Sequence, residues 1–166
     1  MIIREETSAD HAGIRALNRL AFDGVFESRL IDRLRAEELV LASLVALDGE
    51  DIAGHILFSR LGVTVDGWTV RAAALAPMSV MPERQRQGIG SALVRAGLEA
   101  VSSQGIEAVF VLGHPAYYPR FGFSPAVAAG LASPYNGDAF MALELAPDAL
   151  RGGDGVVTYP DAFDPE

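Results

Sequence analysis

Residues 80–91 read Val-Met-Pro-Glu-Arg-Gln-Arg-Gln-Gly-Ile-Gly-Ser, and this is the most informative stretch of the chain. A largely apolar run over 72–81 ends just before Pro82, and a helical pattern begins at Gly88. Glycine has no Cβ, so a ligand can approach the backbone closely at Gly88 and Gly90. The first N–H groups of a helix lack internal partners and carry partial positive charge, and Arg84 and Arg86 add local charge. The segment therefore predicts an anion site, suited to a pyrophosphate group.

Two common phosphate-binding motifs do not fit these glycines. The Walker motif requires a lysine, and the chain contains none. The dinucleotide fingerprint requires a third glycine, but Leu93 stands there. It also requires an acidic residue at the end of the next strand, whereas Glu107 precedes that strand. A glycine-tolerant turn with surface arginines remains the alternative to a phosphate site.

What remains is Gln85-x-x-Gly88-x-Gly90 directly after a strand. This resembles the acetyl-CoA-binding motif Arg/Gln-x-x-Gly-x-Gly/Ala of the Gcn5-related N-acetyltransferase (GNAT) superfamily. A second segment, Tyr-Pro-Arg-Phe-Gly-Phe at 118–123, is similar to the GNAT segment Tyr-x-x-x-Gly-Phe, which follows the fifth strand. One helix and one strand lie between the two motifs, as in the superfamily. The whole run 76–145 resembles the YhbS-like branch of predicted GNAT acetyltransferases.

Length and composition describe an ordinary globular protein. The chain has 166 residues, with 50% hydrophobic and 21% charged residues, and we expect a single domain over 1–166. No apolar stretch reaches the roughly 18 residues of a membrane helix, the N-terminus does not resemble a signal peptide, and cysteine is absent. A cytoplasmic location without membrane contact therefore fits. A net charge of -9 argues against general nucleic-acid binding. The three histidines have no metal-ligand spacing, so no metal site is expected.

Hydrophobic periodicity predicts the elements. Strands are expected at 2–5, 40–47, 52–61, 63–65, 68–70, 72–81, 108–112, 139–145 and, in the tail, 156–159. Helices are expected from Thr7 or Ser8 to Phe22, over 26–39 and over 88–103, where Gln104-Gly105 ends the helix. Pro115 could open a short further helix that Gly122 closes, although Pro119 interrupts the helix usual in the superfamily. These elements predict an α/β (α+β) fold, and the resemblance implies the GNAT-type mixed, mainly antiparallel central sheet with helices on both faces.

The resemblance implies acetyl-CoA as co-substrate and a primary amine as acceptor. The residues that it implies for acetyl-CoA binding are Met78, Ser79, Val80, Gln85, Arg86, Gln87, Gly88, Ile89, Gly90 and Ser91. A backbone N–H near Ser79 or Val80 would polarise the thioester carbonyl. Tyr118 matches the general acid of the family and is therefore favoured over Tyr117 for this role. A tyrosine suits the role because its usual pKa of about 10 keeps it protonated at neutral pH.

The acceptor side is less defined. Glu27 lies between two helices that wall the acceptor site in GNAT folds, and it either contacts the amine or is a solvated helix residue. His114 is a base, a substrate contact or, as the favoured reading, a structural residue at the strand end. The absence of cysteine disfavours an acetyl-thiol enzyme, so the amine should attack directly in a ternary complex. A non-catalytic acyl-CoA-binding module and another kind of nucleotide-binding protein are the competing hypotheses. The acceptor, the general base, the acyl group and a homodimer are left open.

Overall fold

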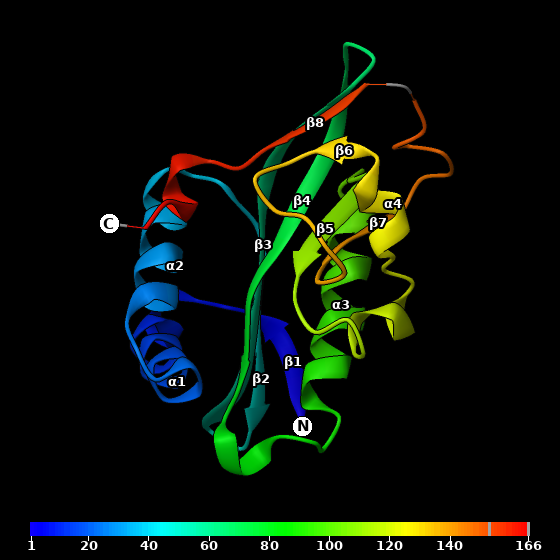
Figure 1. The fold of residues 1–166 in the computed structure, drawn as a ribbon. Coiled ribbons are helices and arrows are strands. Elements are labelled where there is room, and N and C mark those ends of the chain that lie inside the picture. Colours follow the sequence, from blue (N-terminus) through cyan, green and yellow to red (C-terminus); the bar gives the residue numbers. More distant parts are fainter. Residues whose placement is uncertain (153, 166) are drawn as a thin grey trace. The chain divides into compact units, whose positions relative to one another are not determined.

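The structure, a computed structural model, describes residues 1–152 and 154–165, which fall into two units (Figure 1). The first unit holds residues 1–59, 76–100 and 165, and the second holds residues 60–75 and 101–164. Strands β3 (Asp51–Val65) and β4 (Trp68–Val80) and helix α3 (Ile89–Ser103) pass from one unit into the other. The hydrogen-bonded order of the main strands is β1-β2-β3-β4-β5-β7.

In the first unit, helices cover both faces of an antiparallel ladder. The strands are β1 (Ile2–Glu5), β2 (Val40–Asp48) and the first part of β3. Helices α1 (His11–Phe22) and α2 (Phe26–Ala36) lie on one face and α3 on the other (Figure 1). A Cβ on Gly97 of α3 would collide with the ring of Phe58, and a Cβ on Gly54 would lie 2.9 Å from Leu93. The absence of side chains at these two positions therefore lets α3 lie close against the sheet.

The second unit carries the other strands. Strand β5 (Ala108–Leu112) pairs in parallel with β4 and antiparallel with β7 (Phe140–Glu144). Strand β8 (Gly155–Thr158) pairs antiparallel with β3 and parallel with β6 (Leu131–Ala132). Phe110 and Phe140 stack with ring centroids 5.7 Å apart. Short helical pieces complete the chain: α4 (Pro125–Ala129) and the 3-10 helices Ser8–Asp10, Pro82–Arg84, Tyr118–Phe121 and Asp161–Phe163.

The predicted fold class is confirmed, while some strand limits were wrong. The expected strands 52–61 and 63–65 are one strand, β3, and the expected strands 68–70 and 72–81 are one strand, β4. Gly62 does not break β3. A Cβ there would lie 3.1 Å from the carbonyl oxygen of Thr158, so the glycine allows β8 to approach.

The second helix is also shorter than predicted, because α2 ends at Ala36 rather than at residue 39. Glu38 has a φ of 57°, and the N–H of Leu39 donates to the carbonyl of Leu34 at 3.0 Å. The N–H of Glu38 donates to the carbonyl of Arg35 at 3.1 Å. These bonds form a Schellman motif with a glutamate in the left-handed position, where a glycine is usual. The sequence therefore carries no signal for this helix end.

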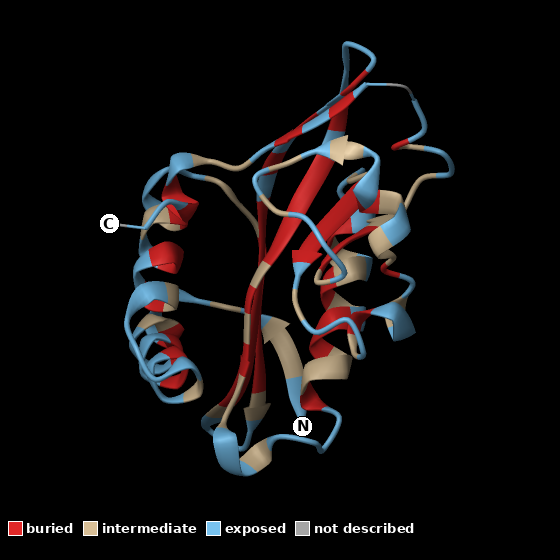
Figure 2. Cartoon of the chain, viewed as in Figure 1, coloured by how far each residue is buried: buried red, intermediate tan, exposed pale blue. Residues whose placement is uncertain are grey.

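Buried residues concentrate on the strands and on the inner faces of the helices (Figure 2). In β5, residues 108–111 are buried, whereas Leu112 at its end is 51% exposed. In α3, Leu93, Val94 and Val101 are buried, whereas Leu98 is half-buried. Among the described residues, no helix is long and apolar enough to cross a membrane.

Candidate functional site

The predicted phosphate cradle is a tight turn between β4 and α3, within the first unit. Gly88 has a φ of 86°, and a Cβ added there would have no atom within 4 Å. The first α-helical bond runs from the N–H of Ala92 to the carbonyl of Gly88 at 3.0 Å. The N–H groups of Ile89 and Gly90 therefore have no acceptor inside the helix. Open space in front of a backbone with such donors suits an anion.

The two arginines of the turn differ in their surroundings. Arg84 forms an ion pair with Asp48, and Glu83 and Asp51 also raise its pKa. The local positive charge expected from Arg84 is therefore balanced by Asp48. Arg86 is exposed, and its φ of 65° places it in the left-handed region. Gln85 and Gln87 are exposed, and their side-chain amides donate to the carbonyls of Val80 at 3.3 Å and Glu83 at 3.4 Å.

At the end of β4, beyond its ladder with β5, backbone N–H groups point alternately toward and away from β3. The parallel ladder with β5 joins Ala72–Ala74 to Ala108–Phe110, and β4 continues past it to Val80. The N–H of Met81 donates to Ala53 of β3 at 2.8 Å. Because N–H groups alternate in direction along a strand, the N–H of Val80 points away from β3. Of the two expected residues, Val80 and not Ser79 thus has an N–H that points away from β3.

Tyr118 lies in the second unit, where a glycine receives its ring. A Cβ on Gly113, just after β5, would collide with this ring. Tyr118 is 7% exposed and packs edge-to-face on Tyr117 and on Phe123, with centroids 5.1 Å and 5.8 Å apart. Burial, with a smaller contribution from Tyr117, raises the pKa of Tyr118 to about 12. The phenol is therefore protonated throughout the neutral range.

The helix around this tyrosine differs from the prediction. It is a 3-10 helix over Tyr118–Phe121 that carries Pro119 in its first turn and does not include Pro115, and Gly122 with a φ of 99° closes it. Tyr117 is half-buried, and the guanidinium of Arg120 lies 4.5 Å from its ring centroid. Its N–H donates to the carbonyl of His114 at 3.0 Å. A proline in the first turn needs no N–H donor, so the short helix tolerates it.

The two candidate acceptor residues lie in different units. Glu27 is half-buried in the first turn of α2, in the first unit. His114 is exposed in the second unit, and its carbonyl also accepts from the N–H of Tyr118 at 3.3 Å. The backbone of His114 thus holds the turn before Tyr118.

The described cavities do not contain the predicted site residues. A cavity of about 720 Å³ in the first unit lies between α1, the β2–β3 turn and the Pro82–Arg84 helix. Another, of about 400 Å³, lies in the second unit between α4 and the start of β7. Neither is lined by a residue predicted for acetyl-CoA or amine binding. Gly88 of the candidate phosphate site is exposed at a surface turn.

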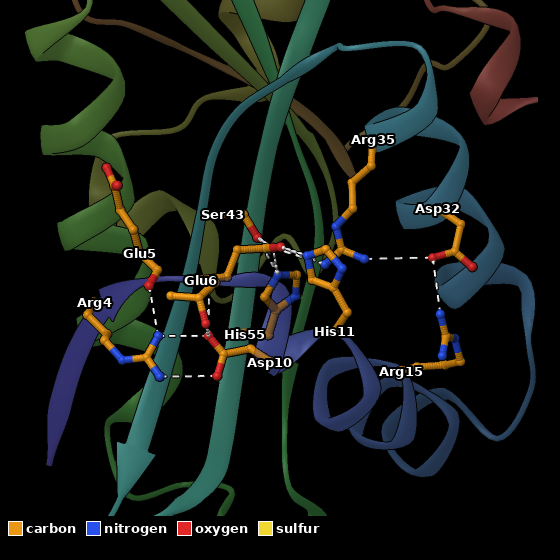
Figure 3. Close-up of polar contacts among 11 residues, drawn as sticks. Arg4, Glu5, Glu6, Asp10, His11, Arg15, Asp32, Arg35, Ser43 and His55 are labelled. Atoms are coloured by element: carbon orange, nitrogen blue, oxygen red, sulfur yellow. Dashed lines mark hydrogen bonds and ion pairs between the residues drawn. The ribbon is translucent and has the colours of Figure 1, made fainter.

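Sequence reasoning missed a buried polar cluster in the first unit (Figure 3). Glu6, directly after β1, accepts from Arg35 of α2 at 2.9 and 3.0 Å and from the hydroxyl of Ser43. His11 lies 2.7 Å and His55 3.7 Å from its carboxylate oxygens. Two histidines that are far apart in sequence thus meet at one carboxylate. Among the described residues, no group of His, Cys, Asp and Glu is arranged to hold a metal.

The cluster keeps its carboxylate ionised. Burial alone would raise the pKa of Glu6, but the nearby His55 and the hydrogen bonds from Ser43 and Arg35 outweigh burial and lower it to about 2. Burial also lowers the pKa of His55, and Glu6 opposes this only in part. At neutral pH the cluster therefore holds an ionised Glu6 beside a neutral His55.

We expect Glu6 to make folding stability sensitive to acid. Its pKa is about 2 in the folded chain against a usual 4.5, so its contribution is fully present above pH 4.5 and is lost as the pH falls towards 2. The size of this contribution is about 3 kcal/mol. Urea unfolding between pH 2 and 7 should show this loss in the wild type, and Glu6→Gln should remove that part of the pH dependence. Glu5→Gln is the control, because Glu5 is exposed, and an equal effect of both variants would contradict the assignment.

Comparison with known proteins identifies the family. The sequence model of the acetyltransferase (GNAT) domain matches residues 2–126. The chain belongs to the GNAT acetyltransferase family. The resemblance inferred from the two motifs is confirmed, and the family places the chain among the acyl-transferring enzymes.

Relatives of this GNAT protein align over most of its length. The uncharacterized N-acetyltransferase YhbS of Escherichia coli strain K12 is 37% identical over 166 residues, which cover 98% of each chain. The uncharacterized N-acetyltransferase YjhQ of the same strain is 37% identical over 131 residues, which cover 76% of this chain and 72% of YjhQ.

Two solved GNAT structures are also similar. A crystal structure of YhbS from Escherichia coli in complex with CoA gives a TM-score of 0.88 at 37% identity, covering 98% of this chain and 91% of that one. A GNAT acetyltransferase from Brucella melitensis in complex with acetyl-CoA gives a TM-score of 0.81 at 34% identity, covering 98% and 97%.

Proposed function

We propose that this chain transfers the acetyl group of acetyl-CoA to a primary amine, with both units acting as one acetyltransferase domain. The observation that carries the proposal is the cradle. Gly88 leaves open space in front of a helix end whose first N–H groups lack internal acceptors. The complexes of the two similar structures with CoA and acetyl-CoA support the same ligand here.

The residues present fit the chemistry of this co-substrate. The backbone of 88–91 would hold the pyrophosphate, with Gln85, Arg86 and Gln87 at its edge. Met78 to Val80 would face the pantetheine arm, and the N–H of Val80 would donate to the thioester carbonyl oxygen. Arg86 should contribute less than the backbone, because it is exposed and its charge is screened by salt.

Direct transfer requires one bond to form as another breaks. The neutral amine nitrogen forms a bond to the acetyl carbon, and the bond from that carbon to sulfur breaks. Tyr118 would give its proton to the departing sulfur, for which a protonated phenol is needed. Glu27 and His114 stay candidates for the amine side. The net charge of -9 favours a cationic acceptor.

Release of CoA tests the proposal. Wild-type protein is incubated with acetyl-CoA and a panel of amines comprising polyamines, an aminoglycoside, amino acids and a peptide with a free N-terminus. A thiol reagent reports CoA, and the protein adds no background because it has no cysteine. Amine-dependent CoA release, matched by N-acetylated product in mass spectra, is the expected result. Intersecting initial-velocity lines are expected for direct attack.

The other outcomes identify the alternatives. Calorimetric binding of acetyl-CoA without turnover of any amine would favour an acyl-CoA-binding module. Parallel initial-velocity lines would contradict direct attack. An absence of acetyl-CoA binding would overturn the proposal.

A further inference from the structure

Three polar side chains form a row across β2, β3 and β4 in the first unit. Ser43 pairs with Leu57 and Val45 pairs with His55, so strand alternation puts Ser43 and His55 on one face of the sheet. Figure 3 shows both beside Glu6, on the side of α1 and α2. Because the N–H of Met81 bonds to Ala53, the antiparallel register sets Ser79 opposite His55. Ser79 is 4% exposed and His55 0%, so the row is buried.

Hydrogen-bond directions define the tautomer of His55. An ionised Glu6 only accepts hydrogen bonds, so the hydroxyl of Ser43 donates its one proton to it. The Ser43 oxygen lies 2.8 Å from Nε2 of His55 and must therefore accept from it. Neutral His55 thus carries its proton on Nε2, and Nδ1 has a lone pair. The 3.7 Å between Nε2 and Glu6 allows the carboxylate to stabilise an imidazolium.

Two buried polar atoms at the β4 end of this row have no hydrogen-bond partner in the described part of the chain. They are Nδ1 of His55 and the hydroxyl oxygen of Ser79. A buried basic nitrogen without a partner costs free energy, and a catalytic role is one reason for such a group to be kept. Ser79 directly precedes Val80, whose N–H is the proposed donor to the thioester.

We propose that His55 is the proton acceptor of the transfer reaction and that Ser79 relays the proton. The inference rests on the proposed function and extends it to the missing base. The N–H bond of the acceptor ammonium breaks and its proton goes to the oxygen of Ser79, while the Ser79 proton forms a bond to Nδ1 of His55. The amine lone pair becomes free to attack. The imidazolium, held by Ser43 and Glu6, returns the proton to solvent after the product leaves.

The surrounding charges set the pH range of this relay. Glu6 and His11 lie on the α1 side of His55, and Arg35, paired with Asp32 at 3.7 Å, lies on the α2 side. Burial and Arg35 lower the pKa of His55 below its usual 6.5, against the pull of Glu6. His55 is therefore a base throughout the neutral range. The rate of the bound complex should fall only when the pH drops below the pKa of His55.

Variants of the row separate a relay from a packing role. His55→Gln keeps an N–H donor for Ser43 but has no basic nitrogen. It should lower kcat by roughly 10²–10⁴-fold and remove the acid limb of the kcat–pH profile, with calorimetric acetyl-CoA affinity unchanged. Ser79→Ala should lower kcat in the same way with a smaller change in packing. Ser59→Ala is the matched control, because Ser59 is also fully buried on β3 with an unpartnered hydroxyl, and it should keep wild-type kcat.

A measurement without turnover tests the same proposal. Nitrogen-15 NMR of the histidine side chains should show His55 with its proton on Nε2 at pH 7, and protonation of Nδ1 at a pH below 6.5. A proton on Nδ1 at pH 7 would overturn the relay, whatever the activity. The relay would also be overturned if both His55→Gln and Ser79→Ala kept the wild-type kcat and the acid limb of the kcat–pH profile. The acetyltransferase function would stand in that case. A wild-type protein without acetyl transfer would instead overturn the proposed function, and the relay with it.

Discussion

Tyr118→Phe should lower kcat by roughly 10²–10⁴-fold, the usual contribution of a positioned general acid. The substitution removes one hydroxyl and keeps the ring that packs on Gly113, Tyr117 and Phe123. Acetyl-CoA affinity should therefore hardly change, because the lost interaction matters mainly in the transition state. The phenol has a pKa of about 12, so any fall of kcat below pH 10 must come from another group. Steady-state kinetics with an accepted amine measures kcat, and calorimetry measures the affinity for acetyl-CoA.

Tyr117→Phe is the matched control for this prediction. Tyr117 is half-buried next to Tyr118 and packs under Arg120, so the same atom is removed one residue away. Its kcat should stay near that of the wild type. Full activity of Tyr118→Phe, with chemistry rate-limiting, would exclude the general-acid role. Loss of activity in Tyr117→Phe alone would move the assignment by one residue.

Local backbone signals explain which parts of the fold could be predicted. Helix α3 ends in a Schellman motif with Gly105 at a φ of 84°, and the sequence predicts this end correctly because glycine marks it. Helix α2 ends in the same motif with Glu38 at a φ of 57°, and no residue type marks that end. The predicted division into strands 52–61 and 63–65 was wrong, because Gly62 continues β3 and admits β8, a contact that only the tertiary structure contains.

The residues of the candidate site also fall into those that the sequence predicts and those that it does not. The cradle and Tyr118 lie in contiguous motifs, so they can be recognised from the chain alone. The cluster of Glu6, Arg35, Ser43 and His55 is assembled from a loop, a helix and two strands, and no spacing in the sequence connects them. Its one signal is a histidine within the apolar strand that begins at residue 51. The pairing of Arg84 with Asp48 could not be predicted from the sequence for the same reason, since the two residues meet only in the fold.

Gly88→Trp should abolish measurable CoA binding in calorimetry while leaving the fold largely intact. The new side chain would fill the open space in front of the first-turn N–H groups, where the pyrophosphate is proposed to lie. A φ of 86° is also unfavourable for any residue with a Cβ and costs about 1–2 kcal/mol. Both effects act at an exposed turn, so circular dichroism should be close to that of the wild type.

Gly67→Trp separates the loss of the cradle from this backbone strain. Gly67 lies in the exposed β3–β4 turn with a φ of 81°, and a Cβ there also has no atom within 4 Å. The control variant therefore carries the same strain and the same added ring, and it should bind CoA like the wild type with a similar loss of stability. Gly90→Trp should behave like Gly88→Trp. Unchanged CoA affinity in both cradle variants would refute the assignment, because a bound pyrophosphate and an indole cannot occupy the same space at the start of α3.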